Sequence, residues 1–480
     1  MCANKKANDD SLIVAIRDLN THGQGVGVIE NDPSGDCQGM ICFVDGALPG
    51  ERISGTLRER KRNYLIVTLD QVLEPSLDRI DSDCRYFPEC GSCRLRHLNY
   101  PAELAVKEKH VRDLLSRNGL LGHDSPVFKQ IMGMKDPLHY RGKSIFPVTS
   151  DPAGSGLLIG QYRYGSHDLV DLHDCHIQSR PALALVNRIR ELASRDQVTA
   201  YDERTHDGTL RHLLIRTGFS SQEIMVVFVV NDRQADEAIT SWLPLLKDTI
   251  KPLGFALQSS WINDMDTRGN RILSSKYRHL DGSQTIEEII NGVTYRISPD
   301  SFFQVNPRQA AVLFDEVIRA AELQPGERVL DLYSGVGAIS LQFASAGKEL
   351  VPPLEVTGVD RVKQAVMDAR ANAKINELVN LSFIEADATE WLKDYEDNAE
   401  NQPFDIIVVD PPRKGLDPKA LDVLRESGTP EIIYVSCNPA TLARDLALLS
   451  DVYGIESVQP IDMFPRTTHV ETVVLMSRNG

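Results

Sequence analysis

The spacing of apolar and polar residues changes in character along the 480-residue chain. Near the N-terminus, turn-forming clusters separate five short runs that are apolar or alternate with polar residues, at residues 12–16, 26–29, 41–44, 52–57 and 64–69. Short strands at this spacing are typical of a small barrel of the oligonucleotide-binding type. Gly23, Gly25 and Gly27 lead into the second run and predict a bend or bulge there.

The C-terminal third of the chain has a different period. From residue 328 onward, apolar runs of strand length alternate with stretches of helical periodicity, which predicts a doubly wound parallel sheet. Asn306 and Pro307 form a cap-and-proline start signal for a helix just before this region. Apolar residues at helical spacing follow that signal, at Ala310, Leu313, Phe314, Val317 and Ala321.

The region between them mixes both periods. Helices are expected at residues 102–117, where Gly119 is placed to end the helix, and at residues 182–193. Strands are expected at residues 213–216 and 224–230. The fold class is therefore α/β, and it divides into a barrel, a central α+β domain and a Rossmann-like domain, at residues 1–78, 79–300 and 301–480.

The composition indicates the cellular compartment in which we expect the protein. The chain is 42% apolar and 25% charged, as in soluble globular proteins, and no apolar run approaches the ~18 residues needed to cross a bilayer. Residues 1–10 contain lysines without an apolar stretch behind them, so we expect no secretory signal and a cytoplasmic protein. A monomer is the default expectation.

The distribution of charge is uneven. A net charge of −16 argues against a broad nucleic-acid-binding surface. However, residues 84–143 contain eleven Lys and Arg against six Asp and Glu, and residues 58–64 add a basic run beside a tyrosine. Such runs are often solvated loops, and contact with RNA is the sharper interpretation.

Eight cysteines in a cytoplasmic chain are expected to be reduced, so clustering indicates metal binding or catalysis. Cys84, Cys90 and Cys93 cluster, with five residues between the first two and two between the next. Cys175 is the next cysteine along the chain. Four cysteine thiolates suit either an iron–sulfur cluster or a closed zinc site.

Acidic residues stand where successive strands of the predicted parallel sheet end. Asp331 and Asp360 close the first two strands, Asp387 follows the third, and Asp410 closes the fourth in an Asp-Pro-Pro-Arg-Lys-Gly stretch. The glycine-containing turn at residues 334–337 lets a ligand approach the backbone, and an acid at the second strand suits a ribose diol. One such acid is often only a helix cap, but their recurrence indicates a cofactor.

A thiol stands at the end of the next strand. Cys437 follows the apolar run at residues 432–436, within Ser-Cys-Asn-Pro, where open α/β sheets place their active sites. Glu471 lies 34 residues further on, in a segment with strand character. Together with the turn and the Asp-Pro-Pro stretch, the pair indicates a methyltransferase that attacks its substrate covalently.

With Ser-Phe-Phe-Gln-Val-Asn at residues 301–306 and His-Val-Glu at residues 469–471, these motifs make the C-terminal half resemble the RNA uracil-5 methyltransferase family. The N-terminal half resembles members that carry a TRAM barrel and an iron–sulfur cluster, including enzymes for 23S ribosomal RNA. The likeness spans residues 12–476. It implies methyl transfer from S-adenosylmethionine to carbon 5 of a uridine in structured RNA, with ribosomal RNA favoured over tRNA.

The resemblance also implies roles for single residues. Cys437 would add to carbon 6 of uracil, which makes carbon 5 nucleophilic, and Glu471 would remove the carbon-5 proton. Since neither can reach a stacked base, the uridine must be flipped out or unpaired. Phe302 is the candidate stacking face, and Arg141 is a candidate RNA contact. The residues expected around S-adenosylmethionine are Gln304, Tyr333, Ala338, Asp360, Asp387 and Asp410.

Two further implications concern metal and cofactor contacts. The cysteines that would ligate a [4Fe–4S] cluster are Cys84, Cys90, Cys93 and Cys175, with zinc as the alternative metal. Ser334 stands where many relatives have cysteine, and Ala338 stands where a polar side chain is common. The alanine removes a hydrogen bond to the cofactor worth roughly 1 kcal/mol.

Other functions stay open at this point. RNA cytosine-5 methyltransferases also form a cysteine adduct, but they commonly use a second cysteine in a Pro-Cys motif at the place of Asp410. This chain has no cysteine between Cys175 and Cys437. A tRNA uridine methyltransferase and an RNA-binding protein with a vestigial methyltransferase fold are the remaining readings, and the presence of Cys437, Glu471 and Asp410 argues against the vestigial fold.

Overall fold

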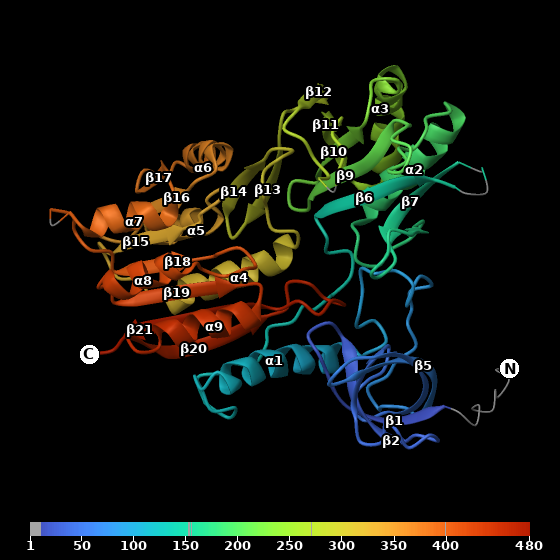
Figure 1. Cartoon of the computed structure of the whole chain (residues 1–480). Helices are drawn as coiled ribbons and strands as arrows, with labels where there is room; N and C mark the ends of the chain where they lie inside the picture. Colours follow the sequence, from blue (N-terminus) through green and yellow to red (C-terminus); the bar gives the residue numbers. More distant parts are fainter. Residues whose placement is uncertain (1–10, 152–153, 155, 270, 399) are drawn as a thin grey trace. The chain divides into compact units, whose positions relative to one another are not determined.

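The computed structural model of the chain describes residues 11–151, 154, 156–269, 271–398 and 400–480. Residues 1–10, on which the expectation of no secretory signal depends, lie outside the described residues. The chain divides into two compact units, one made of Met1–Val111 with Arg466–His469 and the other of Arg112–Pro465 with Val470–Gly480. Figure 1 labels their helices and strands.

The first unit contains the predicted barrel, closed in the order β1-β2-β3-β5-β4. Its strands are β1 Leu12–Leu19, β2 Gln24–Asn31, β3 Ile41–Asp45, β4 Arg52–Arg60 and β5 Leu65–Glu74. Alternate residues of β1 and β2 are buried, as a half-buried strand requires. The β1–β2 register shifts between Ile16 and Asp18, so the extra residue lies in β1, opposite Val26 and Gly27, rather than in the glycine run itself. A Cβ on Gly27 would lie 2.5 Å from Val14 Cγ1.

The helix α1, Tyr100–Arg117, follows a segment of turns. It begins two residues before the predicted start, because the Asn99 side chain accepts a hydrogen bond from the Ala102 amide at 2.9 Å and caps the first turn. Gly119 adopts φ 72° just beyond its end, which is the expected glycine stop.

In its described part, the second unit has two seven-stranded sheets, and the first is ordered β12-β11-β10-β9-β6-β7-β8. Its strands are β6 Lys143–Ser150, β7 Leu157–Tyr162, β8 Leu169–Asp171, β9 Leu210–Gly218, β10 Glu223–Val230, β11 Ala256–Asp264 and β12 Tyr277–Gly282. The helices α2 Arg180–Arg195 and α3 Asp236–Ile250 pack on one face, and the short helix η1 Lys251–Leu253 follows α3. Phe146, Leu213 and Ile215 are buried in the core beneath them.

A hairpin and a helix connect the two sheets along the chain: β13 Ile286–Ile290, β14 Val293–Ile297 and α4 Pro307–Ala320. Asn291 and Gly292 have φ of 50° and 79°, the two left-handed positions that a tight type I′ hairpin turn needs. Asn306 caps α4 as its sequence predicts, accepting from the Gln309 amide at 3.3 Å.

The second sheet of this unit is the predicted doubly wound sheet, ordered β17-β16-β15-β18-β19-β21-β20. Its strands are β15 Arg328–Leu332, β16 Glu355–Asp360, β17 Leu381–Glu385, β18 Ile406–Val409, β19 Glu431–Ser436, β20 Tyr453–Ile461 and β21 Glu471–Arg478. Its helices are α5 Ala338–Gly347, α6 Lys363–Ile375, α7 Ala388–Glu396, α8 Pro418–Glu426 and α9 Pro439–Leu449. The first five strands in the sheet order are parallel, and β21 lies antiparallel between β19 and β20.

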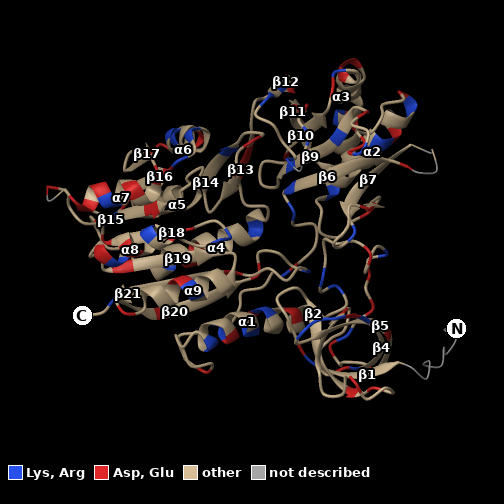
Figure 2. Cartoon of the chain, in the orientation of Figure 1, with Lys and Arg blue, Asp and Glu red and all other residues tan. Residues whose placement is uncertain are grey.

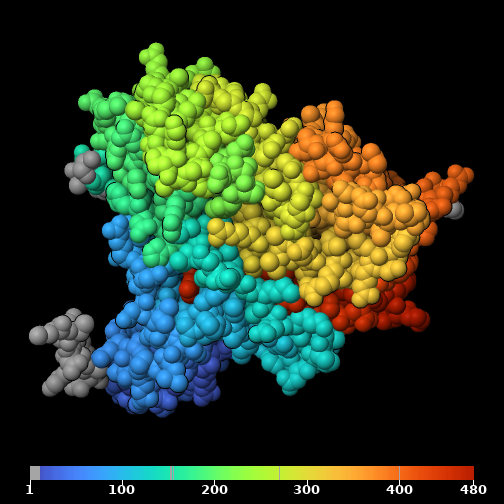
Figure 3. Space-filling view, turned by 180° about the vertical axis from the view of Figure 1, so that it is seen from behind, coloured from blue at the N-terminus to red at the C-terminus, as the bar shows by residue number. Residues whose placement is uncertain are grey.

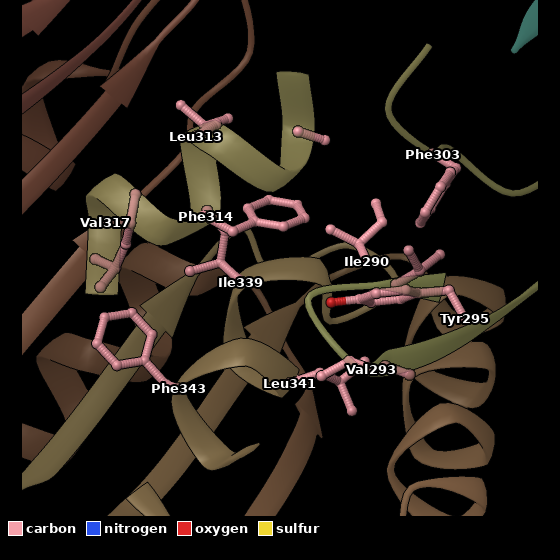
Figure 4. Close-up of a cluster of buried hydrophobic side chains, with 14 of the residues drawn as sticks. Ile290, Val293, Tyr295, Phe303, Leu313, Phe314, Val317, Ile339, Leu341 and Phe343 are labelled. Atoms are coloured by element: carbon pink, nitrogen blue, oxygen red, sulfur yellow. The ribbon is translucent and has the colours of Figure 1, made fainter. Parts of the chain in front are cut away.

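One hydrophobic cluster joins the hairpin, α4, α5 and the doubly wound sheet (Figure 4). Phe314 of α4 and Phe343 of α5 lie in it, and the rings of Tyr295 and Phe303 are 5.3 Å apart. This packing holds the segment just before α4 against the sheet. Figure 3 shows the green to orange parts of the chain as one continuous surface, in agreement with their membership of one compact unit.

Acidic and basic positions are interspersed over the helices rather than separated onto two faces, as Figure 2 shows. Among the described residues, no helix is long and apolar enough to cross a membrane.

Candidate active site

The carboxyl ends of the parallel strands carry the predicted polar residues. Asp410 directly follows β18, Cys437 directly follows β19, and Asp360 is the last residue of β16. Tyr333 directly follows β15, with φ 65°. Because parallel strands end at the same edge of a sheet, these side chains belong to one edge, where open α/β sheets bind their ligands.

The register of two strands brings Cys437 and Glu471 together. Glu471 is the first residue of β21, and β21 runs antiparallel to β19 with Ser436 opposite Thr472. Continued by one residue, this register sets Cys437 opposite Glu471. The 33 residues between them in sequence form α9, β20 and the return to the sheet.

Burial and mutual repulsion shift the acidity of these groups. Burial, followed by the negative charges of Glu471 and Asp410, raises the pKa of the half-buried Cys437 thiol to about 11, against the opposing charge of Arg413. Burial also raises the pKa of Glu471 to about 8, with Asp410 adding to the rise, and raises the pKa of Asp410 to about 7. A cation bound among these groups would lower all three pKa values.

The loop after Asp410 is fastened to the helix after Cys437. The Asn438 side chain caps α9, accepting from the Ala440 amide at 3.2 Å, and donates to the Arg413 carbonyl at 3.0 Å. The buried Asp445 carboxylate accepts from the Tyr434 hydroxyl at 2.7 Å and from the Leu416 amide at 2.8 Å. These bonds fix the Asp-Pro-Pro loop relative to β19, so Asp410 and Cys437 are held by one network.

The turn after β15 leaves room for a ligand. Gly335 has φ 55°, and no atom lies within 4 Å of the place that a Cβ would occupy. Its amide donates to Asp360 Oδ2 at 3.0 Å, which ties the turn to the end of β16. Two buried polar atoms beside it, Asp331 Oδ1 and Ser334 Oγ, have no hydrogen-bond partner among the described residues. Burial raises the pKa of Asp331 to about 7.

Comparison with known proteins agrees with this geometry. A family model described as tRNA (Uracil-5-)-methyltransferase matches residues 198–479. An RNA methyltransferase of Halalkalibacterium halodurans is 36% identical over 472 residues, which cover 98% of this chain and 97% of that protein. One from Bacillus cereus is 37% identical over 481 residues, with coverage of 98% and 97%. The chain belongs to the tRNA (uracil-5-)-methyltransferase family.

A solved member of this kind has the same fold. The structure of Pyrococcus abyssi tRNA (uracil-54, C5)-methyltransferase in complex with S-adenosyl-L-homocysteine matches with a TM-score of 0.72 and 26% identity, over 96% of this chain and 99% of that one. The chain is thus an S-adenosylmethionine-dependent RNA methyltransferase of the uracil-5 family. The RNA methyltransferase family predicted from the motifs, and its doubly wound domain, are confirmed.

The residues present fit S-adenosylmethionine. The open turn at Gly335 admits a ligand to the backbone, and the acids at the strand ends suit the positive charge of a sulfonium and an amino group. Asp360 already accepts two backbone amides, from Gly335 at 3.0 Å and from Val362 at 2.7 Å. Asp387 caps α7 with one carboxylate oxygen, which is the capping role that its sequence position left open. Their contacts with the cofactor stay predictions.

The other predicted site residues lie before α4, at the start of α5 and before β6. Phe302 exposes 67% of its surface, Gln304 is half-buried, and Ala338 is half-buried at the first position of α5. Arg141 is half-buried, and its backbone forms an isolated β-bridge with Gln178 just before β6. An exposed phenylalanine in a packed segment is suited to stacking on a base.

Sequence reasoning did not single out two polar residues that organise the site, Asn438 and Asp445. Asn438 was accessible, because Asn-Pro after an apolar strand is the same start signal as Asn306-Pro307. Asp445 was not, since an acid inside a helix shows no outward sign that its partners come from β19 and from the loop after β18.

The four cysteines predicted to bind a metal cluster are divided between the two compact units. Cys84, Cys90 and Cys93 belong to the first unit and Cys175 to the second. Burial raises the pKa of the Cys90 thiol, and the nearby Cys84 adds to the rise. Among the described residues, no group of three or more His, Cys, Asp or Glu is arranged to hold a metal ion.

Proposed function

We propose that this enzyme methylates carbon 5 of a uridine in structured RNA through a covalent adduct on Cys437. The observation that carries the proposal is the strand register that sets Cys437 opposite Glu471, beside Asp410. A nucleophile and a base on adjacent strand ends can act on the two neighbouring carbons of one pyrimidine ring.

S-adenosylmethionine supplies an electrophilic methyl group. The Cys437 thiol first gives its proton to water. Its Sγ then forms a bond to carbon 6, so the electrons of the carbon 5–carbon 6 double bond can attack that methyl group. Carbon 5 then carries both a methyl group and its original hydrogen, with S-adenosylhomocysteine as the leaving group. Glu471 removes this hydrogen as a proton, the double bond re-forms, and the thiolate leaves. Glu471 afterwards releases the proton to water.

The elevated pKa values fit the order of these events. A thiol with a pKa of about 11 stays protonated in the resting enzyme, which limits side reactions of the thiolate. A carboxyl group with a pKa of about 8 is a stronger base than an exposed glutamate once it is ionised. Both groups therefore act when a cationic ligand and the base are present.

We propose 23S ribosomal RNA as the first substrate, with tRNA as the second. The resemblance to cluster-bearing enzymes for 23S ribosomal RNA supports the first choice. The five-stranded barrel, closed as in oligonucleotide-binding folds, supports RNA binding in either case. The description of the matching family and the tRNA enzyme of Pyrococcus abyssi support the second.

The test is nucleoside mass spectrometry on unmodified 23S ribosomal RNA and tRNA, each incubated with S-adenosylmethionine and with wild type or Cys437→Ala. We expect 5-methyluridine in one RNA with wild type alone. New 5-methylcytidine would overturn the base assignment. Absence of any product, with S-adenosylmethionine and RNA both bound, would favour the vestigial reading.

We also propose that Cys84, Cys90, Cys93 and Cys175 bind a [4Fe–4S] cluster. The support is the number of thiols, the clustering of three of them in sequence and the resemblance to cluster-bearing relatives. Anaerobic purification followed by iron, sulfide and zinc analysis tests it. We expect about four irons per chain, lost in Cys90→Ser, whereas one zinc and no iron would establish a zinc site.

A further inference from the structure

Three positive charges lie close together in the central sheet, on Arg141, Lys143 and Arg216. Lys143 and Arg216 are on the face opposite the one that α2 and α3 cover. Part of that face is covered as well, because Leu214 and Met225 pack there in the cluster that contains the hairpin β13–β14. Lys143 of β6 pairs directly with Arg216 of β9. Arg141 lies two residues before Lys143, and its charge and that of Arg216 both act on the lysine. Like charges directly opposite each other on neighbouring strands destabilise a sheet.

Burial makes this arrangement costly. It lowers the pKa of Lys143 to about 7, with Arg216 and Arg141 adding to the fall. Arg216 is only 3% exposed, and burial lowers its pKa to about 10. A folded chain keeps same-sign charges in such surroundings only where something of opposite sign offsets them.

The protein's own acids do not offset them fully. Asp300 and Asp368 act on Arg216 at a distance, but among the described residues neither forms an ion pair with any of the three cations. Both carboxylates instead accept hydrogen bonds from Ser298 Oγ.

Several donors of this cluster are unused within the described part of the chain. Lys143 and Arg141 have no side-chain hydrogen bond or ion pair there, and Arg216 Nε is buried without a partner. The hydroxyl of Tyr277, whose pKa burial raises to about 12, is likewise buried and unpartnered. Unused donors around concentrated positive charge are the chemistry of an anion site.

The cluster adjoins the segment that presents Phe302. Arg216 donates through one guanidinium nitrogen to the carbonyls of Ser301 and Pro299, the second at 3.3 Å. The Gly142 amide, between Arg141 and Lys143, donates to the Val305 carbonyl at 2.6 Å. The segment that carries Phe302, the exposed ring proposed to stack on the base, is therefore bonded to the Arg216 side chain before the ring and to the Gly142 backbone after it.

We propose that Lys143 and Arg141, with the charge of Arg216 behind them, bind a phosphate of the RNA backbone next to the uridine that stacks on Phe302. The inference rests on the proposed function, because it assigns the strand on which that uridine lies. It gives the central sheet the task of positioning the RNA, apart from the reaction at the end of the doubly wound sheet. A phosphate contact positions the strand without reading its sequence.

Lys143→Gln is the variant that tests this site, and Lys251→Gln is its matched control. Lys251 is an exposed lysine in η1, after the helix that covers the opposite face of the sheet. The probe is fluorescein-labelled oligouridylate, titrated at several KCl concentrations with S-adenosylhomocysteine present. We expect Lys143→Gln to weaken binding about tenfold and to reduce the slope of log affinity against log salt by about 0.7. Lys251→Gln should match wild type in both.

A second measurement separates ligand binding from a purely structural role. If Lys143 serves the ligand, its replacement relieves repulsion, so Lys143→Gln should melt at or above the wild-type temperature while binding RNA less well. A lower melting temperature together with unchanged oligouridylate affinity and salt slope would overturn the proposal. Stabilisation of wild type by inorganic phosphate with no change in oligouridylate binding would assign the site to the free ion and overturn the RNA assignment.

Turnover distinguishes this inference from the function on which it rests. With the RNA that wild type methylates, Lys143→Gln should raise KM for RNA about tenfold and leave kcat and KM for S-adenosylmethionine unchanged. Wild-type enzyme that binds oligouridylate in a Lys143-dependent manner but forms no 5-methyluridine would contradict the proposed reaction and keep the phosphate site. Equal methylation rates and equal KM for RNA in wild type and Lys143→Gln would contradict the phosphate site and keep the proposed reaction.

Discussion

The two seven-stranded sheets of the second unit each gather buried charge of one sign, and the signs are opposite. At the edge of the doubly wound sheet the charged groups are acids, namely Asp331, Asp410 and Glu471, each with a raised pKa. On the face of the central sheet they are Lys143 and Arg216, each with a lowered pKa. Both arrangements oppose folding until an oppositely charged ligand arrives, so each marks where a ligand belongs.

The way the groups are displayed also differs. A parallel sheet collects residues beyond its strand ends, where loops adjust their orientation around a reacting centre. The central sheet displays Lys143 and Arg216 from within paired strands, so their separation is fixed by the backbone ladder. The first arrangement suits bond making and breaking, whereas the second suits holding a strand in place. Variants in the two regions should therefore fail in different ways.

The largest expected effect is the loss of turnover in Cys437→Ala. Without Sγ no bond forms to carbon 6, so carbon 5 stays too poor a nucleophile for the methyl group. Tritium release from RNA labelled at uridine carbon 5 should fall to background, while RNA affinity stays within twofold of wild type. Residual release above background would show that the reaction does not need the thiol.

Glu471→Gln should be slowed by roughly 10²–10⁴-fold, the usual contribution of a general base. The methyl group can still be transferred, but the carbon-5 proton cannot leave, so the thiol remains bonded to the RNA. A protein–RNA band that survives denaturing electrophoresis should accumulate in this variant. The Cys437→Ala/Glu471→Gln double variant is the control and should show no band.

Asp445→Asn should lower the free energy of unfolding by about 2–3 kcal/mol. Tyr434 and Leu416 both donate to Asp445 Oδ2, whereas Arg444 donates to Oδ1 at 2.7 Å. An amide that keeps its oxygen toward the first two therefore turns its NH2 group toward the Arg444 guanidinium. The loop that carries Asp410 loosens as a result, so kcat should fall while RNA affinity is kept. Denaturant unfolding and steady-state kinetics measure the two effects. The exposed Asp422 of α8 provides the control, and equal losses in Asp422→Asn would contradict the network.

The smallest expected effect is a pH dependence of opposite sign for the two regions. Because the folded pKa of Glu471 is about 8 against 4.5 in the unfolded chain, the native state binds the extra proton, so stability falls as pH rises from 4.5 to 8. For Lys143, about 7 folded against 10.5 unfolded, the unfolded chain binds the extra proton and stability rises from pH 7 to 10.5.

Unfolding measured against pH should show each slope flattened in the matching variant, Glu471→Gln or Lys143→Gln. Activity of wild type should rise as pH approaches 8, because the base must be ionised to act. Parallel slopes in wild type and both variants would show that these two groups are not the ones that titrate.

The sequence predicts the acids at the edge of the doubly wound sheet better than it predicts the cations on the face of the central sheet. Acids and a thiol that follow apolar runs are visible in sequence, because each strand ends at a residue that its own run predicts. The hairpin turn at Asn291 and Gly292 was equally visible as a dipeptide signal. Lys143 and Arg216 gave no such signal, since their meeting depends on the register of two strands 73 residues apart in sequence. Register between distant strands follows from packing of the whole sheet.

The pairing of β19 with β21 sets the spacing between the two side chains that are proposed to react. Since the register of β19 and β21 sets Cys437 opposite Glu471, their spacing does not depend on the length of the loops that join α9, β20 and β21. One residue inserted within β21 would instead turn every later side chain to the other face. Relatives of this enzyme can therefore differ in the length of these loops and keep the same reaction, provided that the number of residues in β21 stays the same.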